Sequence, residues 1–178
     1  NAFDSIKNNL EEFDVSLLHG VTASGKTEIY IKLLEEYVQA EKQVLFLLPE
    51  IALTTQLVQR LTAYFGNEVA VFHSKYTNNE RIEVWNQVLE NSPKAKVVIG
   101  VRSALFLPFS NLGCIIVDEE HEQTYKQTDP APRYHARDAA IVLAKQHKAK
   151  VLLGSATPSL ETYYNVQSKK YGLTELTI

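Results

Sequence analysis

The stretch that decides the fold is Ser16-Leu17-Leu18-His19-Gly20-Val21-Thr22-Ala23-Ser24-Gly25-Lys26-Thr27. Its second part, from Gly20 to Thr27, matches in full the pattern G-x-x-x-x-G-K-[ST] of a phosphate-binding loop. A short apolar strand precedes this loop, and the spacing of apolar residues predicts an amphipathic helix over Thr27–Gln39. A strand, a glycine-rich loop and a helix in this order are typical of α/β domains that bind nucleotides.

The residue types in the loop suit the binding of phosphate groups. Glycines at both ends let backbone amides curl around phosphates, and the following helix presents its positive N-terminus to the same charge. Lys26 is expected to reach the β and γ phosphates of ATP, and the Thr27 hydroxyl is expected to ligate Mg²⁺. The predicted ATP site is the whole loop: Gly20, Val21, Thr22, Ala23, Ser24, Gly25, Lys26 and Thr27. The alternative is a chance glycine turn that caps a helix, and the four matched positions and both flanks argue against it.

Short apolar runs alternate with helical patterns along the rest of the chain. Buried strands are predicted at Val15–His19, Val44–Leu48, Val69–Phe72, Lys96–Ile99, Cys114–Val117 and Val151–Leu153. Further helices are predicted at Leu53–Phe65, Asn79–Leu89 and Ala136–His147. Strands separated by helices favour a mainly parallel sheet with helices on both faces. We therefore expect an α/β fold, a single RecA-like P-loop NTPase domain over residues 1–178.

Composition limits the classes of protein that remain. The chain has 178 residues, of which 45% are hydrophobic and 22% are charged, and a net charge of −3. Without a basic excess, a nucleic-acid partner must be argued from local features. The longest apolar runs fall short of the roughly 20 residues that cross a bilayer, so no membrane partner is expected. The single Cys114 cannot form an internal disulfide, which favours a cytoplasmic location, and the absence of methionine suggests a piece of a longer protein.

A second cluster of charged residues follows the predicted strand Cys114–Val117. Asp118, Glu119 and Glu120 are consecutive acids at a strand end, and His121 comes next. Such acids repel one another unless a cation offsets their charge, and Mg²⁺ together with Lys26 would do so. Asp118 is then expected to anchor Mg²⁺, and Glu119 to orient and deprotonate the attacking water. The alternative for Asp118 alone is a solvated acid at a strand end.

The run Asp118-Glu119-Glu120-His121 resembles the DEEH box of superfamily 2 helicases. The resemblance extends over about residues 3–176 and is greatest to the family of primosomal replication-restart helicases. Besides the DEEH box it rests on five stretches: Leu48 to Thr54, Phe72-His73-Ser74, Gly100 to Phe106, Arg133 to Asp138, and Gly154-Ser155-Ala156-Thr157-Pro158-Ser159.

The resemblance implies the first, ATP-binding motor lobe of a 3′-to-5′ DNA helicase that acts on stalled replication forks. It implies single-stranded and branched DNA, replication-restart proteins and a second motor lobe as partners. Lys26 and Glu119 would be the catalytic residues, and the residues that couple ATP to DNA would be Glu120, His121, Ser155, Ala156 and Thr157. The expected DNA contacts are Pro49, Thr54, Arg102, Ser103, Tyr125, Arg133 and Tyr134.

The segment His121–Tyr134 corresponds in that family to an aromatic-rich loop that couples DNA binding to hydrolysis. The family often carries a tryptophan just before the Arg-Tyr-His run, where this chain has Pro132. The zinc module and the arginine finger of the family lie in parts absent from this chain. We therefore expect no zinc here and almost no ATP hydrolysis by the isolated chain.

Two other functions remain open at this point. One is the ATPase lobe of a different superfamily 2 translocase, in recombination or repair, although such proteins more often have glutamine in place of His121. The other is a nucleotide-binding switch that does not move on DNA. The adjacent pair Asp118 and Glu119 argues against a switch, because a switch can dispense with the catalytic glutamate.

Overall fold

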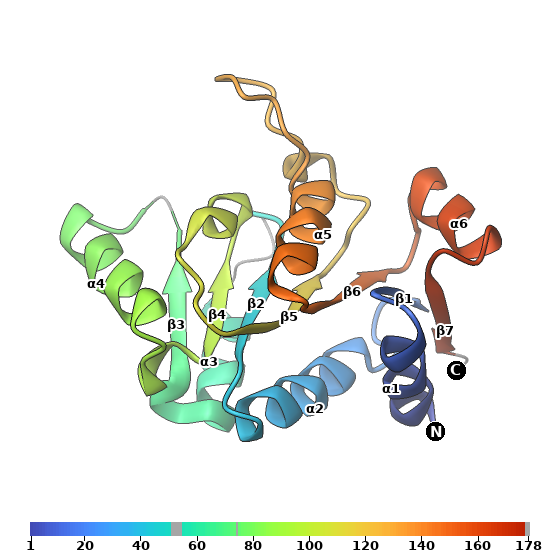
Figure 1. The fold of residues 1–178 in the computed structure, drawn as a ribbon, viewed down its shortest axis with the longest axis horizontal. Coiled ribbons are helices and arrows are strands. Elements are labelled where there is room, and N and C mark those ends of the chain that lie inside the picture. The colour runs from blue at the N-terminus through green and yellow to red at the C-terminus, as the bar shows by residue number, and fades with distance from the viewer. Residues whose placement is uncertain (51–54, 74, 177–178) are drawn as a thin grey trace.

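The computed structural model describes residues 1–50, 55–73 and 75–176. Its core is one sheet of seven strands in the order β3-β4-β2-β5-β6-β1-β7, and every paired neighbour is parallel (Figure 1). The strands are β1 (Val15–Gly20), β2 (Gln43–Leu47), β3 (Val69–Phe72), β4 (Val97–Gly100), β5 (Leu112–Val117), β6 (Lys150–Ser155) and β7 (Gly172–Leu176). The expected fold class, a single RecA-like α/β domain with a parallel sheet, is confirmed.

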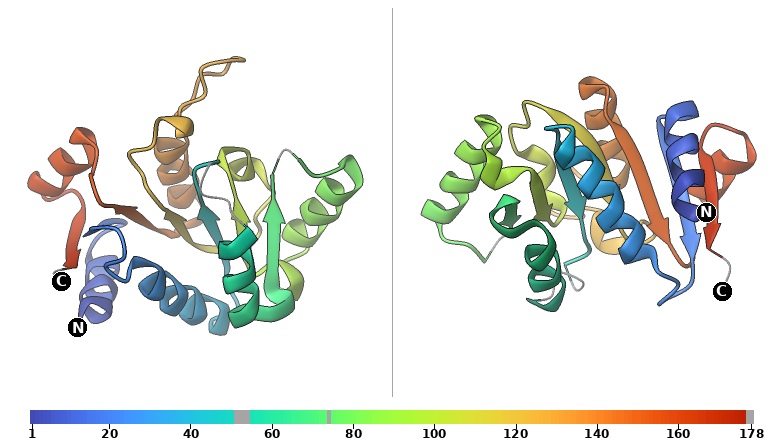
Figure 2. Two further views of the ribbon diagram at one scale, coloured as in Figure 1. Left: turned by 180° about the vertical axis from the view of Figure 1, so that it is seen from behind. Right: turned by 90° about the horizontal axis from the view of Figure 1, so that it is seen from below.

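Helices cover both faces of the sheet. One apolar cluster joins the sheet to α1 (Ala2–Glu12), α2 (Lys26–Gln39) and α3 (Thr55–Phe65), which lie in front of the strands in the right-hand view of Figure 2. A second cluster joins the opposite face to α4 (Asn78–Leu89), α5 (Ala136–His147) and the short helix η3 (Arg102–Phe106). Burial on both faces explains why the inner strands are almost continuously apolar. None of the described helices is long and apolar enough to cross a membrane.

The strand order determines where the motifs meet. The phosphate loop follows β1 and the acids follow β5, and β6 lies between these two strands. Because all three strands are parallel, their carboxyl ends share one edge of the sheet, where ligands of open α/β sheets bind. The loop, the acids and Ser155-Ala156-Thr157 at the end of β6 are therefore neighbours although they are distant in sequence.

All six predicted strands are present, with ends shifted by a few residues. Three elements were not predicted: α1, the short helix α6 (Leu160–Gln167) and the edge strand β7. Only Ile6 and Leu10 are buried in α1, and only Thr162 in α6, so each of these helices buries few side chains. Strand β7 (Gly-Leu-Thr-Glu-Leu) has no apolar run, because it covers only the edge of the sheet.

The segment predicted to be irregular, His121–Tyr134, is partly ordered. It contains a short helical turn, η4 (Gln123–Tyr125), and then an arm that projects away from the body of the domain (Figure 1). Residues 126–135 form this arm. An antiparallel bridge between Lys126 and His135 closes its base, and the backbone N–H of Gln127 donates to the carbonyl of Tyr134 at 2.9 Å.

Candidate active site

The phosphate loop lies between β1 and α2, and its backbone turns sharply twice. Ala23 and Gly25 have positive φ angles of 63° and 92°. Gly25 precedes α2, where a residue with a side chain would be strained. Lys26 begins α2 and is only 8% exposed. Its Nζ donates to the carbonyl oxygens of Gly20 at 2.7 Å and Val21 at 3.3 Å, so the ammonium group lies inside the curve of the loop.

Two further features of the loop fit a bound phosphate. Ser24 Oγ is buried, and among the described residues it has no hydrogen-bond partner. A side chain at Gly20 would place its Cβ 2.6 Å from this oxygen, so only glycine leaves the space open. An unpaired hydroxyl and a buried ammonium group inside a glycine-bounded loop are suitable donors for the phosphates of ATP.

The catalytic acids approach the loop from β5. Glu119 has a positive φ of 47°, which is uncommon for a residue other than glycine and is typical of functional sites. Its Oε1 lies 3.9 Å from Lys26 Nζ, and its Oε2 lies 3.7 Å from His121 Nδ1. Glu119 thus lies between the phosphate loop and the histidine of the DEEH box, next to the site expected for the γ-phosphate.

Asp118 is held by two buried tyrosines. Its Oδ1 accepts a hydrogen bond from the Tyr30 hydroxyl of α2 at 2.8 Å. Its backbone carbonyl accepts one from the Tyr125 hydroxyl at 2.6 Å. Burial raises the pKa of the Asp118 carboxyl, and the negative charge of Glu119 also raises it. An ionised Asp118 would be stabilised by a nearby cation, as the Mg²⁺ assignment of Asp118 and Thr27 requires. Tyr30 was not predicted, although it lies one helical turn after Lys26 and so faces the same side of α2.

Glu120, in contrast, is fully buried and takes part in a polar network away from the phosphate loop. Its carboxylate accepts from the backbone N–H of Ser159 at 2.7 Å, from the Thr162 hydroxyl at 2.9 Å and from Arg137 at 3.0 Å. Arg137 also donates to the Ser159 hydroxyl at 2.6 Å. The third acid therefore links the DEEH box to the starts of α5 and α6. Of these two helices, α5 was predicted from the sequence, whereas α6 and the contacts that Glu120 makes with both helices were not.

The remaining coupling residues meet at the end of β6. His121 Nδ1 lies 2.7 Å from Ser155 Oγ, and the same oxygen accepts from the backbone N–H of Thr157 at 3.0 Å. His19, the last residue but one of β1, comes just before the phosphate loop, and its Nε2 lies 3.3 Å from the carbonyl oxygen of Ala156. The DEEH box, the Ser-Ala-Thr run and the phosphate loop are thus joined by direct contacts.

The expected DNA contacts have different positions in the structure. Pro49 is buried two residues after the end of β2, and its predicted place along the DNA path stays a prediction. Thr54 lies outside the described residues. Arg102 donates to the carbonyls of Thr124 and Lys126, both at 3.2 Å, and so anchors the segment that leads into the arm. The DNA role of Arg102 stays a prediction.

The aromatic residues of the predicted coupling loop have two different environments. Tyr125 is 1% exposed, and its hydroxyl also donates to the carbonyl of Leu47 at 3.1 Å. Its ring belongs to the core of this structure, and the DNA contact expected at Tyr125 stays a prediction. Tyr134 is half-buried against Phe106, with ring centroids 5.2 Å apart, and Arg133 is exposed on the arm. Ser103 lies near them and lines an apolar groove with Phe106 and Trp85 of α4.

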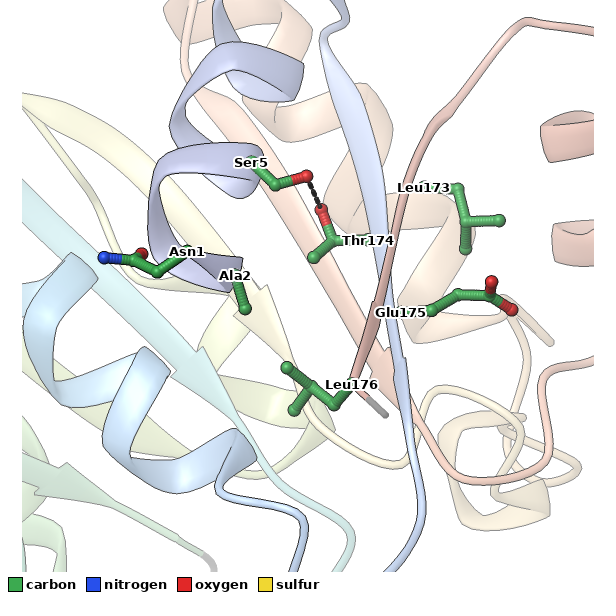
Figure 3. Close-up of a pocket in the computed structure, with 7 residues that line it drawn as sticks. All are labelled: Asn1, Ala2, Ser5, Leu173, Thr174, Glu175 and Leu176. Carbon is green, nitrogen blue, oxygen red and sulfur yellow. Dashed lines mark hydrogen bonds between the residues drawn. The ribbon is translucent and has the colours of Figure 1, made fainter. Parts of the chain in front are cut away.

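A hollow adjoins the phosphate loop on the side of β7 (Figure 3). The residues that line it are Asn1, Ala2, Ser5, Leu173, Thr174, Glu175 and Leu176. Strand β7 pairs with β1 so that Leu176 is opposite Gly20, which places this hollow beside the start of the loop. Its volume of about 510 Å³ is in the range of small-molecule sites, ~300–1,000 Å³.

A full phosphate loop and an adjacent acid pair at one edge of a parallel sheet define a P-loop nucleotide-binding domain. The chain belongs to the DEAD/DEAH box helicase family, whose model matches residues 2–166. The superfamily expected from the motifs is therefore confirmed.

The most informative relatives share about half of the aligned residues. The chain is 56% identical over 159 residues to the replication restart protein PriA of Haemophilus influenzae, covering 89% of this chain and 21% of that protein. It is 47% identical over 177 residues to the PriA of Bacillus subtilis, covering 98% and 22%. The expected resemblance to replication-restart helicases is confirmed, and the chain spans less than a quarter of the length of these two relatives.

Solved structures agree on the fold. RecG bound to a three-way DNA junction superposes with a TM-score of 0.70 at 20% identity, covering 100% of this chain and 24% of that chain. The T4 protein UvsW superposes with a TM-score of 0.64 at 18% identity, covering 99% and 33%. At these identities the likeness establishes the fold alone.

Proposed function

We propose that this chain is the ATP-binding motor lobe of a 3′-to-5′ DNA helicase that acts in the restart of stalled replication forks. The observation that carries the ATPase part is the approach of Glu119 to Lys26, 3.9 Å apart at the edge shared by β1, β6 and β5. The restart role is supported by the PriA relatives, whose printed names describe replication restart. Single-stranded and branched DNA, other replication-restart proteins and a second motor lobe are the proposed partners, in the cytoplasm.

Each residue at this edge has one role in the proposed reaction. Bound Mg²⁺ would neutralise charge that develops on the phosphates of ATP. Thr27 and Asp118 would hold that ion, and Lys26 would leave the loop carbonyls to bind the phosphate oxygens. Glu119 would orient a water molecule and accept its proton. His121, Ser155 and Thr157 would transmit the presence of the γ-phosphate through the contacts that join them.

Two alternatives remain. Another superfamily 2 translocase of recombination or repair would have the same site, and the RecG likeness is to such a fold. The identity of about half to the PriA proteins favours replication restart. A switch without hydrolysis has less support, because Glu119 is turned toward Lys26 by a strained backbone.

Nucleotide binding is the first test, with a matched pair of lysines on α2. Lys26→Ala removes a charge-assisted contact of about 1.5–3 kcal/mol, so the affinity for a fluorescent ATP analogue should fall at least about tenfold. Lys32→Ala removes the same charge from the exposed side of the same helix and should leave the affinity unchanged. Equal affinities for the two variants would contradict the assignment of Lys26.

The helicase part requires a separate measurement. The full-length protein should unwind a forked duplex in an ATP-dependent manner when the single-stranded tail has the polarity for 3′-to-5′ movement. A substrate with only the opposite tail is the control. Equal unwinding of both substrates, or ATP-independent strand separation, would contradict the proposal.

A further inference from the structure

Tyr30 is an unusual residue for the core of a nucleotide-binding domain. It is 1% exposed and lies on α2, one turn after the phosphate-loop lysine. Its ring packs edge-on against Phe46 of β2, with centroids 5.4 Å apart. A phenylalanine would fill the same apolar space without burying a hydroxyl, which is costly unless it is hydrogen-bonded. Among the described residues, the hydroxyl hydrogen-bonds Asp118 Oδ1, at 2.8 Å.

The neighbouring strand makes room for this hydroxyl. Gly154 of β6 faces it, and a Cβ at Gly154 would lie 1.7 Å from the Tyr30 oxygen and 3.2 Å from Asp118 Oδ1. No side chain fits there while the hydrogen bond exists. The Gly154 carbonyl in turn accepts from the backbone N–H of Glu120 at 3.0 Å, which fixes β6 against the acid segment. Three elements, α2, β5 and β6, therefore meet around one hydroxyl group.

We propose that Tyr30 is a positioning residue for Asp118, and that its hydroxyl holds the carboxylate in the orientation that binds Mg²⁺. The inference rests on the proposed function, since it assumes that Asp118 serves the metal of a bound nucleotide. The Tyr30 hydroxyl donates a hydrogen bond to Oδ1 of Asp118. The lone pairs of Asp118 Oδ2 then remain for the metal or for a metal-bound water. Burial and the charge of Asp118 raise the pKa of Tyr30, so the phenol keeps its proton and acts as the donor.

This assignment separates Tyr30 from Tyr125, the other tyrosine that contacts Asp118. Tyr125 bonds only the backbone carbonyl of Asp118, so it fixes the chain but not the carboxylate. Tyr30 bonds the carboxylate itself. Loss of the Tyr30 hydroxyl frees the side chain of Asp118 to rotate while the fold around it is unchanged.

The test measures binding and does not depend on turnover. In the full-length protein, the affinity for a fluorescent, non-hydrolysable ATP analogue is titrated with saturating Mg²⁺ and with EDTA. The ratio of the two affinities measures what the metal adds to binding. Tyr30→Phe should lower this ratio at least about tenfold, the loss expected for one hydrogen bond to a charged group, and leave the affinity in EDTA unchanged. ATPase assays should show a matching rise in the Mg²⁺ concentration that gives half of the maximal rate.

The control removes the same atom elsewhere on the same helix. Tyr37 lies two turns further along α2, where its hydroxyl contacts the buried Cys114 thiol, so Tyr37→Phe should keep the wild-type ratio. Gly154→Ala is a second approach to the same contact, because its Cβ would displace the Tyr30 hydroxyl, and it should also lower the ratio. Thermal melting of each variant identifies any loss of the fold.

The outcomes separate this inference from the proposed function. If the wild-type protein does not bind the analogue, the nucleotide site itself is refuted, and if it binds without a Mg²⁺-dependent gain, the Mg²⁺ assignment of Thr27 and Asp118 is refuted. If the wild type shows the gain and both Tyr30→Phe and Gly154→Ala retain it in full, the positioning role of Tyr30 is refuted while the site stands. A ratio that falls equally in Tyr30→Phe and Tyr37→Phe would also refute it, since the effect would then come from general packing of α2.

Discussion

At the level of single residues, Asp118 illustrates how a functional group can lower the stability of its own domain. Burial raises the pKa of its carboxyl, so the ionised form is disfavoured in the folded protein. The hydrogen bond from Tyr30 and the positive charge of Lys26 act in the opposite direction and favour the ionised carboxylate. The balance leaves Asp118 ready for a cation that offsets its charge.

This balance predicts that Asp118→Asn stabilises the nucleotide-free protein at neutral pH. The folded-state pKa lies above the unfolded value of about 3.9, so the cost of ionisation is complete above the folded pKa and absent below the unfolded one. The variant should therefore melt at a higher temperature than the wild type at pH 7, by about 2–4 °C for each kcal/mol gained in the free energy of unfolding. This difference should vanish as the pH falls to about 4. Thermal denaturation across that range in EDTA is the measurement. A variant less stable than wild type at pH 7 would mean that the Tyr30 hydrogen bond outweighs burial.

At the scale of elements, the buried pair of Glu120 and Arg137 connects the acid segment to two helices. Arg137 lies in the first turn of α5, and the Ser159 and Thr162 groups that share Glu120 belong to the start of α6. A second nitrogen of Arg137 bonds Asp138 at 2.9 Å, but the Asp138 side chain is 62% exposed. The two acids therefore contribute very differently to the position of α5.

Removing the arginine should separate these contributions. Arg137→Ala leaves Glu120 buried without its cation, which costs about 3–5 kcal/mol. Asp138→Ala breaks only the exposed pair and should cost less than about 1 kcal/mol. Urea denaturation of both variants gives the comparison. Similar losses in the two variants would contradict a special role for the buried pair.

The arm is the second element with a consequence for function. Tyr134 is half-buried at its base, whereas Tyr125 belongs to the core. In the full-length protein, Tyr134→Ala should weaken the stimulation of ATP hydrolysis by single-stranded DNA and leave nucleotide affinity unchanged, since base stacking is worth about 1–3 kcal/mol per ring. Tyr125→Ala should instead lower the melting temperature, because it removes a buried aromatic ring. If DNA stimulates the Tyr134→Ala variant as much as the wild type, the DNA role of Tyr134 is contradicted, and packing against Phe106 is its only role.

At the scale of the whole molecule, this lobe supplies one side of the proposed site. Lys26, Thr27, Asp118 and Glu119 meet at one edge of the sheet, but among the described residues no arginine approaches Lys26 or the acids that face it. Arg102 is bonded to the segment that leads into the arm, and Arg137 is bonded to Glu120. We therefore expect a charge from the second motor lobe to stabilise the transferring phosphoryl group.

The isolated chain should accordingly bind nucleotide weakly and hydrolyse ATP very slowly, with little or no stimulation by single-stranded DNA. An arginine finger contributes roughly 10³–10⁵ in rate in related ATPases. Turnover of this chain is compared with that of the full-length protein, each with and without single-stranded DNA. A rate for the isolated chain within about tenfold of the DNA-stimulated full-length rate would show that the lobe holds a complete site.

The sequence alone was sufficient for the features that depend on neighbouring residues. The phosphate loop comes directly after one apolar strand, and Asp118 and Glu119 come directly after another. Six of the seven strands are apolar runs, as expected for a sheet that helices cover on both faces. The class of fold and the ATP-binding loop could therefore be predicted. The elements α1 and β7 were not predicted. Each of them buries few side chains, and β7 forms an edge of the sheet.

Only the tertiary structure decided which partners the buried polar groups have. Tyr30 and Asp118 are 88 positions apart, and their hydrogen bond has room because β6 places Gly154 beside them. Pro49 and Tyr125 were expected at the DNA surface, yet packing buries both. Local patterns determine whether a residue is in a strand or a helix, whereas burial and hydrogen bonding depend on which distant segments the fold brings together.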